Sequence, residues 1–324
     1  MKLIIQIPCY NEEKTLPATI ADLPKQIDGI DTIEYLVIDD GSTDNTCEAA
    51  RASGVHHIVR FKQNKGLARG FCEGLDACLR LGADIIVNTD ADNQYNGADI
   101  PQLVQPILRQ KADMVIGSRP IEENNDFTNS KKRFQKIGSL VVRVVSGTKV
   151  PDAPSGFRAY SRDTALRINV VNSYTYTLET IIQAGHNKTA IDFVPIRTNA
   201  QTRKSRLFKS MWAYMRRSAT VIIRSFAMYK PLRFFSILGT VFSALGLAIS
   251  IRFLVFFFVG QGNGHIQSLV LAVLLILIGV QCFIAGIQAD ITAANRKILE
   301  DIQYRVRKMD SQHGTGSNNE KVDK

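Results

Sequence analysis

The first part of the chain alternates short apolar runs with amphipathic segments. The apolar runs, which have the length and composition of buried strands, lie at 3–7, 35–38, 58–61, 85–87 and 114–116. The segments with the apolar spacing of helices lie between them, at 13–23, 45–52, 67–81 and 99–110. This alternation predicts an α/β domain with a mostly parallel sheet and helices on both of its faces.

The rest of the chain is patterned for a membrane. Aromatic and aliphatic residues alternate with Lys and Arg at 207–230, which predicts amphipathic interfacial helices, with a basic helix packed on the soluble domain as the alternative. Two later stretches are each apolar over about a membrane's thickness. The expected parts are therefore an α/β domain (1–206), interfacial helices (207–230), a first span (231–259), a short external loop (260–268), a second span (269–289), a cytoplasmic amphipathic helix (290–309) and a disordered polar tail (310–324).

The charge pattern orients this arrangement. The formal net charge is +10, which favours an anionic partner such as acidic lipid, a phosphorylated substrate or nucleic acid. Lys and Arg flank the two spans on their outer sides, whereas 260–267 has none. The positive-inside rule therefore predicts a multi-pass protein of the cell (inner) membrane with the α/β domain and both termini in the cytoplasm. No nucleic-acid-binding motif accompanies the charge, so nucleic acid is not an expected partner.

The number and spacing of the five cysteines do not indicate disulfides or a metal site. The cysteines are odd in number and form no Cys-x-x-Cys pair. This pattern favours reduced thiols that behave as small apolar residues, and it argues against a disulfide framework or a zinc site.

Polar residues follow each predicted strand of the α/β domain. Asp90 and Asp92 lie two residues apart after the strand at 85–87, at the sheet edge where open α/β sheets bind ligands. Two such carboxylates suit a hard cation, Mg²⁺ or Mn²⁺. An isolated Asp-x-Asp is also a common helix cap. The other polar turns, at 8–12, 39–44, 64–70 and 117–119, would meet at the same edge, which favours a ligand site.

These turns carry a recognisable series of motifs. They read Pro-x-Tyr-Asn-Glu (8–12), Asp-Asp-Gly-Ser-x-Asp (39–44), Asn-x-Gly (64–66), Asp-Ala-Asp-x-Gln (90–94) and Gly-Ser-Arg (117–119). Together they resemble the family 2 glycosyltransferases of the GT-A fold. Over about residues 1–210 the chain is most similar to the polyprenyl-phosphate glycosyltransferases, such as dolichyl-phosphate mannose synthase and the membrane-anchored undecaprenyl-phosphate enzymes. The predicted pair of spans fits the membrane-anchored members.

The resemblance implies a donor site and its chemistry. The donor would be a nucleotide-sugar, either a UDP-sugar or GDP-mannose, and transfer would invert the anomeric centre. Asp90 and Asp92, with Gln94, would hold Mg²⁺ or Mn²⁺, which acts as a Lewis acid for the departing diphosphate. The implied catalytic residues are Asp90, Asp92 and Arg119. The implied nucleotide-binding residues are Pro8, Tyr10, Glu12, Asp39, Asp40, Lys65, Gly66, Asp90 and Ala91.

The resemblance also implies an acceptor site for the phosphate of a polyprenyl lipid. Arginine suits this task because its planar fork meets phosphate oxygens in pairs. The implied acceptor-phosphate residues are Arg119, Arg133, Ser139, Arg158, Arg203 and Arg206. The segment 152–158 resembles the family's Asp-x-x-Ser-Gly-Phe-Arg motif, which places Asp152 and Arg158 near the reacting centre, while Phe157 is expected in the core.

Three other functions are compatible with parts of the pattern. A processive polysaccharide synthase would need more spans and a Gln-x-x-Arg-Trp segment, which the sequence lacks. A transferase to another lipid or glycan hydroxyl, and a non-catalytic scaffold that only binds nucleotide-sugars, stay open. The pair of spans contains small residues, which favours a homo-oligomer, with a tetramer as one candidate.

Overall fold

The computed structural model describes residues 1–120, 139, 142–143, 146–171, 175–199, 211–259 and 266–317. The chain forms two compact units, Met1–Ile222 with Glu300–Lys324, and Ile223–Leu299. The strands are β1 (Lys2–Cys9), β2 (Thr32–Asp39), β3 (His57–Arg60), β4 (Ile85–Asn88), β5 (Met114–Ser118), β6 (Arg158–Ser161) and β7 (Ile191–Pro195). The helices are α1 (Leu16–Ala21), α2 (Thr46–Ala52), α3 (Leu67–Arg80), the 3₁₀ turn η1 (Gly97–Asp99), α4 (Ile100–Leu108), α6 (Arg162–Arg167), α7 (Thr177–His186), α8 (Met211–Tyr229), α9 (Pro231–Phe258) and α10 (Ile266–Ser317).

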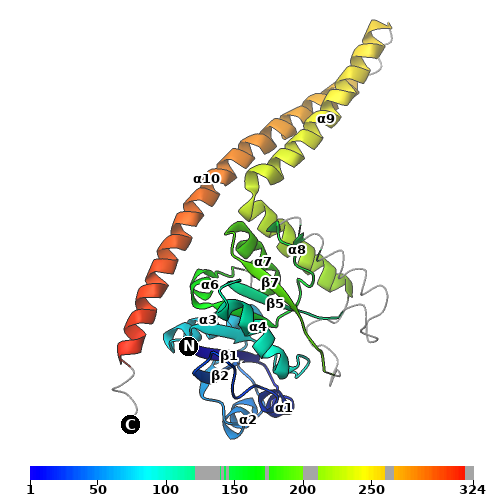
Figure 1. The fold of residues 1–324 in the computed structure, drawn as a ribbon. Helices are drawn as coiled ribbons and strands as arrows, with labels where there is room; N and C mark the ends of the chain where they lie inside the picture. Colours follow the sequence, from blue (N-terminus) through cyan, green and yellow to red (C-terminus); the bar gives the residue numbers. More distant parts are fainter. Residues whose placement is uncertain are drawn as a thin grey trace. The chain divides into compact units, whose positions relative to one another are not determined.

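The first unit is built on a mostly parallel seven-stranded sheet (Figure 1). The strand order is β3-β2-β1-β4-β6-β5-β7, and β6 runs antiparallel to both of its neighbours. The predicted α/β class and all five predicted strands are confirmed. The strands β6 and β7 were not predicted, and they extend the sheet beyond the alternating first part of the chain.

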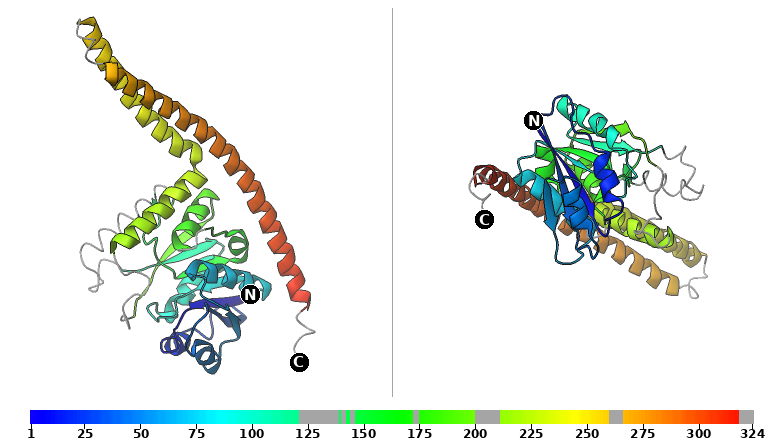
Figure 2. Two further views of the ribbon diagram at one scale, coloured as in Figure 1. Left: turned by 180° about the vertical axis from the view of Figure 1, so that it is seen from behind. Right: turned by 90° about the horizontal axis from the view of Figure 1, so that it is seen from below.

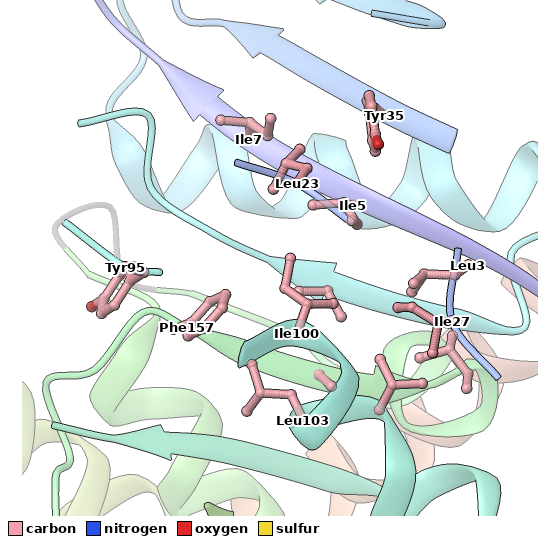
Figure 3. Close-up of a cluster of buried hydrophobic side chains, with 14 of the residues drawn as sticks. Leu3, Ile5, Ile7, Leu23, Ile27, Tyr35, Tyr95, Ile100, Leu103 and Phe157 are labelled. Carbon is pink, nitrogen blue, oxygen red and sulfur yellow. The ribbon is translucent and has the colours of Figure 1, made fainter. Parts of the chain in front are cut away.

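Helices cover both faces of this sheet. On one face, Leu3, Ile5 and Ile7 of β1 are fully buried in a cluster that includes side chains of α1 and α4 and the predicted core residue Phe157 (Figure 3). On the other face, α3 lies so close that a Cβ on Gly74 would come 2.8 Å from Cδ1 of Ile38. Each fully buried aliphatic side chain contributes about 1.5–3 kcal/mol. The central strands are therefore rigid supports for the turns at their ends.

The second unit is an antiparallel pair of apolar helices. Figure 2 shows α9 beside the first part of α10, and a Cβ on Gly239 would lie 2.9 Å from the Gly279 carbonyl oxygen. Both helices are long and apolar enough to cross a membrane by length and composition. The small residues of the spans thus contact each other within one chain, and the homo-oligomer remains a prediction.

The observed C-terminal helix differs from the predicted one. The second span and the amphipathic helix at 290–309 are one uninterrupted helix, α10, which continues to Ser317. The tail was predicted to be disordered from residue 310, whereas only 318–324 lie outside the described residues. Contacts within the first unit hold the turns of α10 that precede this extension: the Tyr304 hydroxyl donates to Asp163 at 2.7 Å, and Arg307 donates to the Ile168 carbonyl at 2.6 Å.

Candidate active site

The turns after β1 and β2 are joined by hydrogen bonds. The Asn11 N–H donates to Ser42 Oγ at 2.9 Å, and the Glu12 N–H donates to Thr46 Oγ1 at 2.9 Å. In return the Thr43 N–H donates to Asn11 Oδ1 at 2.8 Å. Asn11 has a φ of 56°, a conformation that asparagine tolerates better than most residues. These bonds fix the turns at the carboxyl ends of β1 and β2, at 10–15 and 40–46, which we call the rim.

Two neighbouring aspartates after β2 hold the adjoining turns. The buried Asp40 carboxylate accepts from the Lys65 N–H at 2.6 Å and the Gly66 N–H at 2.9 Å. Burial raises the pKa of Asp40, and these two amides oppose that rise. The fully buried Asp39 accepts from the Ser42 N–H at 2.9 Å and forms an ion pair with Arg60, whose Nε lies 3.1 Å away. The structure therefore gathers the turns that were predicted to bind the nucleotide, with both carboxylates already hydrogen-bonded.

Backbone conformation explains one glycine of this rim. Gly41 has a φ of 71°, and a Cβ there would lie 2.5 Å from the carbonyl carbon of Gln63. Only glycine fits this close approach between two turns. Of the other predicted donor residues, Glu12 is buried, Tyr10 is 42% exposed, and Pro8 lies in β1 opposite Ile38.

The Asp90 and Asp92 pair lies just beyond the end of β4. Burial, and then the charge of Asp92, raise the pKa of Asp90 to about 7. The Asp92 carboxylate accepts from the Gln94 N–H at 3.2 Å. Within the described residues the Asp90 carboxylate accepts no hydrogen bond. Ala91 is buried between the two aspartates, and its carbonyl accepts from Thr19 Oγ1 at 3.0 Å.

The chemistry of this pair fits a divalent cation. Two mutually repelling carboxylates, one of them without a hydrogen-bond donor among the described residues, are stabilised by positive charge. Across the described ranges, no group of three or more His, Cys, Asp or Glu side chains is placed to hold a metal. A cation on Asp90 and Asp92 would therefore take its remaining ligands from substrate oxygens and water, as Mg²⁺ commonly does. Gln94 is partly exposed in the same turn.

The raised pKa of Asp90 has a measurable consequence for stability. A carboxyl whose pKa is higher in the folded chain stabilises the fold at low pH, and that contribution is lost as pH rises from about 4 to about 7. Asparagine mimics the neutral acid. In chelator, Asp90→Asn should therefore unfold at a higher temperature than wild type at pH 8, and the gap should close toward pH 4. A gap that stays constant in thermal unfolding between pH 4 and pH 8 would contradict the shift.

The Arg119 guanidinium is held by a buried carboxylate, and its charge is near enough to Asp90 to oppose the rise in the pKa of that group. Arg119 follows β5, and its Nε and Nη2 donate to the two Asp152 oxygens at 2.7 and 3.0 Å. The Asp152 side chain is fully buried, while that of Arg119 is 19% exposed. Burial lowers the pKa of Arg119, but the charge of Asp152 more than offsets this effect and raises the pKa, and the Asp90 carboxylate contributes to the same rise. The structure thus brings Arg119 and Asp152 together near Asp90.

Other predicted phosphate contacts are placed differently. Arg158 is fully buried, and its nitrogens donate to the Ser155 carbonyl, the Thr180 hydroxyl and the Ala153 carbonyl at 2.7–2.9 Å. Ser139 is buried, and its Oγ accepts from the Ala153 N–H at 3.4 Å. These placements do not fit direct contact with a lipid phosphate, because both side chains face the interior. Three further predicted contacts lie outside the described residues: Arg133, Arg203 and Arg206.

Sequence reasoning missed several side chains that support the site. Arg60 forms an ion pair with Asp39. The side chains of Asn88, Tyr95 and Tyr176 form hydrogen bonds next to the turn that follows β4 and contains Asp90, which we call the Asp90 turn. Asn88 had a local signal, since it is a polar residue at the end of the apolar run of β4. The others had none, because their partners are distant in sequence.

Comparison with known proteins identifies the family. A family model described as Glycosyl transferase family 2 matches residues 4–167, half of the chain. The chain belongs to this family and is a glycosyltransferase. Glucosyl-3-phosphoglycerate synthase from Mycobacterium tuberculosis, solved with Mn²⁺ and UDP, shares the fold with a TM-score of 0.54 and 22% identity over 70% of this chain and 78% of that one.

Two curated relatives are more similar in sequence. The UDP-N-acetylglucosamine–dolichyl-phosphate N-acetylglucosaminyltransferase of Methanococcus voltae is 33% identical over 59% of this chain and 83% of its own length. The undecaprenyl-phosphate mannosyltransferase of Micrococcus luteus is 32% identical over 54% of this chain and 74% of its own. The predicted resemblance to polyprenyl-phosphate glycosyltransferases is confirmed at this level.

Proposed function

We propose that this protein transfers a sugar from a nucleotide-sugar, a UDP-sugar or GDP-mannose, to a membrane polyprenyl phosphate. The observation that carries the proposal is the pairing of an anionic and a cationic group in one site. The charge of Arg119, which Asp152 holds in place, acts on Asp90, the first carboxylate of the Asp90 and Asp92 pair. The names of the two curated relatives support the acceptor class, and the two apolar helices support a lipid substrate.

The proposed reaction is a single displacement. An oxygen of the lipid phosphate forms a bond to C1 of the sugar while the bond from C1 to the nucleoside diphosphate breaks, which inverts the anomeric centre. The acceptor is a phosphate monoester with a second pKa of about 6, so it is largely anionic at neutral pH and needs no strong base. The site's tasks are therefore to position two anions and to balance their charge.

Each residue has a task in this proposal. Asp90 and Asp92 would hold Mg²⁺ or Mn²⁺, which when bound supplies positive charge to the leaving diphosphate. Arg119, oriented by Asp152, offers its remaining N–H groups to phosphate oxygens. The hydrogen-bonded turns of Asn11 and Asp40 form the donor side of the site.

The proposed setting is the inner face of the cell membrane. The helices α9 and α10 would span the bilayer and α8 would lie at its surface. Lys and Arg on the outer flanks of the spans favour a cytoplasmic position for the catalytic unit and both termini. In that position the site would have access to cytoplasmic nucleotide-sugars and to lipid headgroups.

One observation favours a second candidate. A transferase to a lipid or glycan hydroxyl needs a general base with a raised pKa, and burial raises that of Asp90 to about 7. A bound divalent cation would remove this possibility by keeping Asp90 ionised. The two candidates therefore differ in acceptor chemistry and in the pH dependence of the rate.

A panel of substrates tests the proposal. Purified full-length protein in detergent is incubated with UDP- and GDP-sugars, Mg²⁺ or Mn²⁺, and either undecaprenyl phosphate, dolichyl phosphate or diacylglycerol. We expect labelled sugar on a polyprenyl phosphate, equimolar nucleoside diphosphate, an inverted anomer by NMR and loss of turnover in EDTA. Transfer to diacylglycerol alone, or turnover that a chelator leaves unchanged, would overturn it.

A further inference from the structure

A buried polar network lies beneath the Asp90 turn. Asn88, the last residue of β4, is fully buried, and its Nδ2 donates to the Gly156 carbonyl at 2.9 Å and to the Tyr176 hydroxyl at 2.8 Å. Its Oδ1 accepts from Gln6 Nε2 at 2.9 Å. The Gly156 N–H donates to the Tyr95 hydroxyl at 3.0 Å. Asn88 and Tyr95 therefore fix the two polar backbone groups of Gly156.

The Gly156 backbone lies directly against the Asp90 carboxylate. A Cβ on Gly156 would come 3.3 and 3.5 Å from the two carboxylate oxygens of Asp90, and 2.8 Å from the Tyr176 hydroxyl. No side chain fits between Gly156 and these two groups. The orientation of the Asp90 carboxylate thus depends on where the Gly156 backbone lies.

Tyr176 is itself held rigidly. Its ring stacks on Phe71 of α3, with centroids 3.9 Å apart and planes 5° from parallel, and the side chain is 1% exposed. The position of the Tyr176 hydroxyl is therefore fixed. The hydroxyl accepts a hydrogen bond from Asn88 Nδ2 and donates one to the Gly156 carbonyl oxygen at 3.4 Å. Tyr176 precedes α7, far in sequence from the Asp90 turn.

We propose that Tyr176 is a positioning residue for the Asp90 carboxylate, acting through Asn88 and the Gly156 backbone. The inference rests on the proposed function, in which Asp90 is a ligand of the divalent cation. Groups that orient a metal ligand without touching the metal typically contribute 10–100-fold to metal affinity. Tyr176 acts here indirectly, through the position of the Gly156 backbone, so we expect its removal to lower metal affinity by an amount near the lower end of that range.

Tyrosine-to-phenylalanine changes at two positions give a matched test. Tyr176→Phe removes the hydroxyl that fixes Asn88. Tyr160→Phe removes a second buried hydroxyl, which has no hydrogen-bond partner among the described residues although its ring also contacts Phe71. Binding of Mn²⁺ alone to the full-length protein in detergent is measured from the free Mn²⁺ signal in electron paramagnetic resonance. Circular dichroism reports folding of each variant.

The expected result separates the two tyrosines. Tyr176→Phe should bind Mn²⁺ about tenfold more weakly, and Tyr160→Phe should stay within about twofold of wild type. Equal affinity of Tyr176→Phe and wild type would overturn the inference, and so would equal weakening by the two changes. If Tyr176→Phe fails to fold, Gly156→Ala serves in its place, because it displaces the same contacts while keeping every hydrogen-bonding group.

Failure of the proposed function gives a different pattern. Wild type that binds no Mn²⁺ even when UDP or GDP is added to supply phosphate oxygens, or Asp90→Asn that binds it as wild type does, would show that Asp90 is not a cation ligand. That outcome would overturn the metal role in the proposed function, together with the inference. Strong binding by wild type, loss in Asp90→Asn and no effect of Tyr176→Phe would overturn the inference alone.

Discussion

Asp92→Asn should lower the rate of sugar transfer at least roughly 10³-fold at saturating donor and lipid. The change removes one of two negative charges that would hold the divalent cation, and with it several kcal/mol of stabilisation of the leaving diphosphate. Asparagine keeps an oxygen that can accept from the Gln94 N–H, so the turn after β4 should keep its shape. The loss is measured as labelled lipid formed per minute at several Mn²⁺ concentrations.

Asp113→Asn is the control for this change. It removes the same charge from the same sheet, but Asp113 lies before β5 at the opposite edge, where its carboxylate contacts Ser161. We expect the control to retain wild-type turnover. A rate for Asp92→Asn within tenfold of wild type at saturating Mn²⁺ would count against the cation site.

The second large effect is expected from Asp152→Ala. The Asp152 side chain is fully buried and Arg119 is only 19% exposed, so removal of the carboxylate leaves a guanidinium with little access to water. Breaking such a buried pair by removing one partner costs about 3–5 kcal/mol of the free energy of unfolding. Transfer activity should fall as well, because Asp152 accepts both side-chain hydrogen bonds that Arg119 donates within the described residues. Urea unfolding of the full chain in detergent, followed by circular dichroism, measures the loss.

Asp99→Ala provides the matched comparison. Asp99 is also buried and also accepts two side-chain bonds from an arginine, but that arginine, Arg197, is 64% exposed. Once unpaired, Arg197 can be solvated, so the loss of stability should be clearly smaller than for Asp152→Ala. Equal losses in the two variants would show that burial of Arg119 is not what makes its pair important.

The fold could be predicted where the hydrophobic pattern is local. Each of the five predicted strands is a contiguous apolar run, and each was found. The strand β6 was missed because Arg158 and Ser161 at its ends make it look polar, and because it inserts between β4 and β5 from a distant part of the chain. The strand β7 is a short strand that ends in Pro195 and pairs with β5 at the end of the strand order.

The site could be predicted only as far as strand order brings residues together. Parallel strands end at one edge, so the clustering of the Asp40 and Asp90 turns followed from the pattern. Whether an arginine faces solvent or the core does not follow from the motif that contains it, and Arg158 proved to be fully buried. Tyr176 carried no signal, because its partners Asn88 and Gly156 are joined to it only by the completed fold.

The joined turns after β1 and β2 have a consequence for how donors are told apart. The amides of Asn11, Glu12 and Thr43 are already committed to partners within the rim. In the proposed function, a nucleotide bound there would meet backbone that need not be ordered first, so little entropy would be lost on its account. We therefore expect exposed side chains such as Tyr10 to distinguish uracil from guanine, and exchanging those side chains between relatives should change base preference without remodelling the loops.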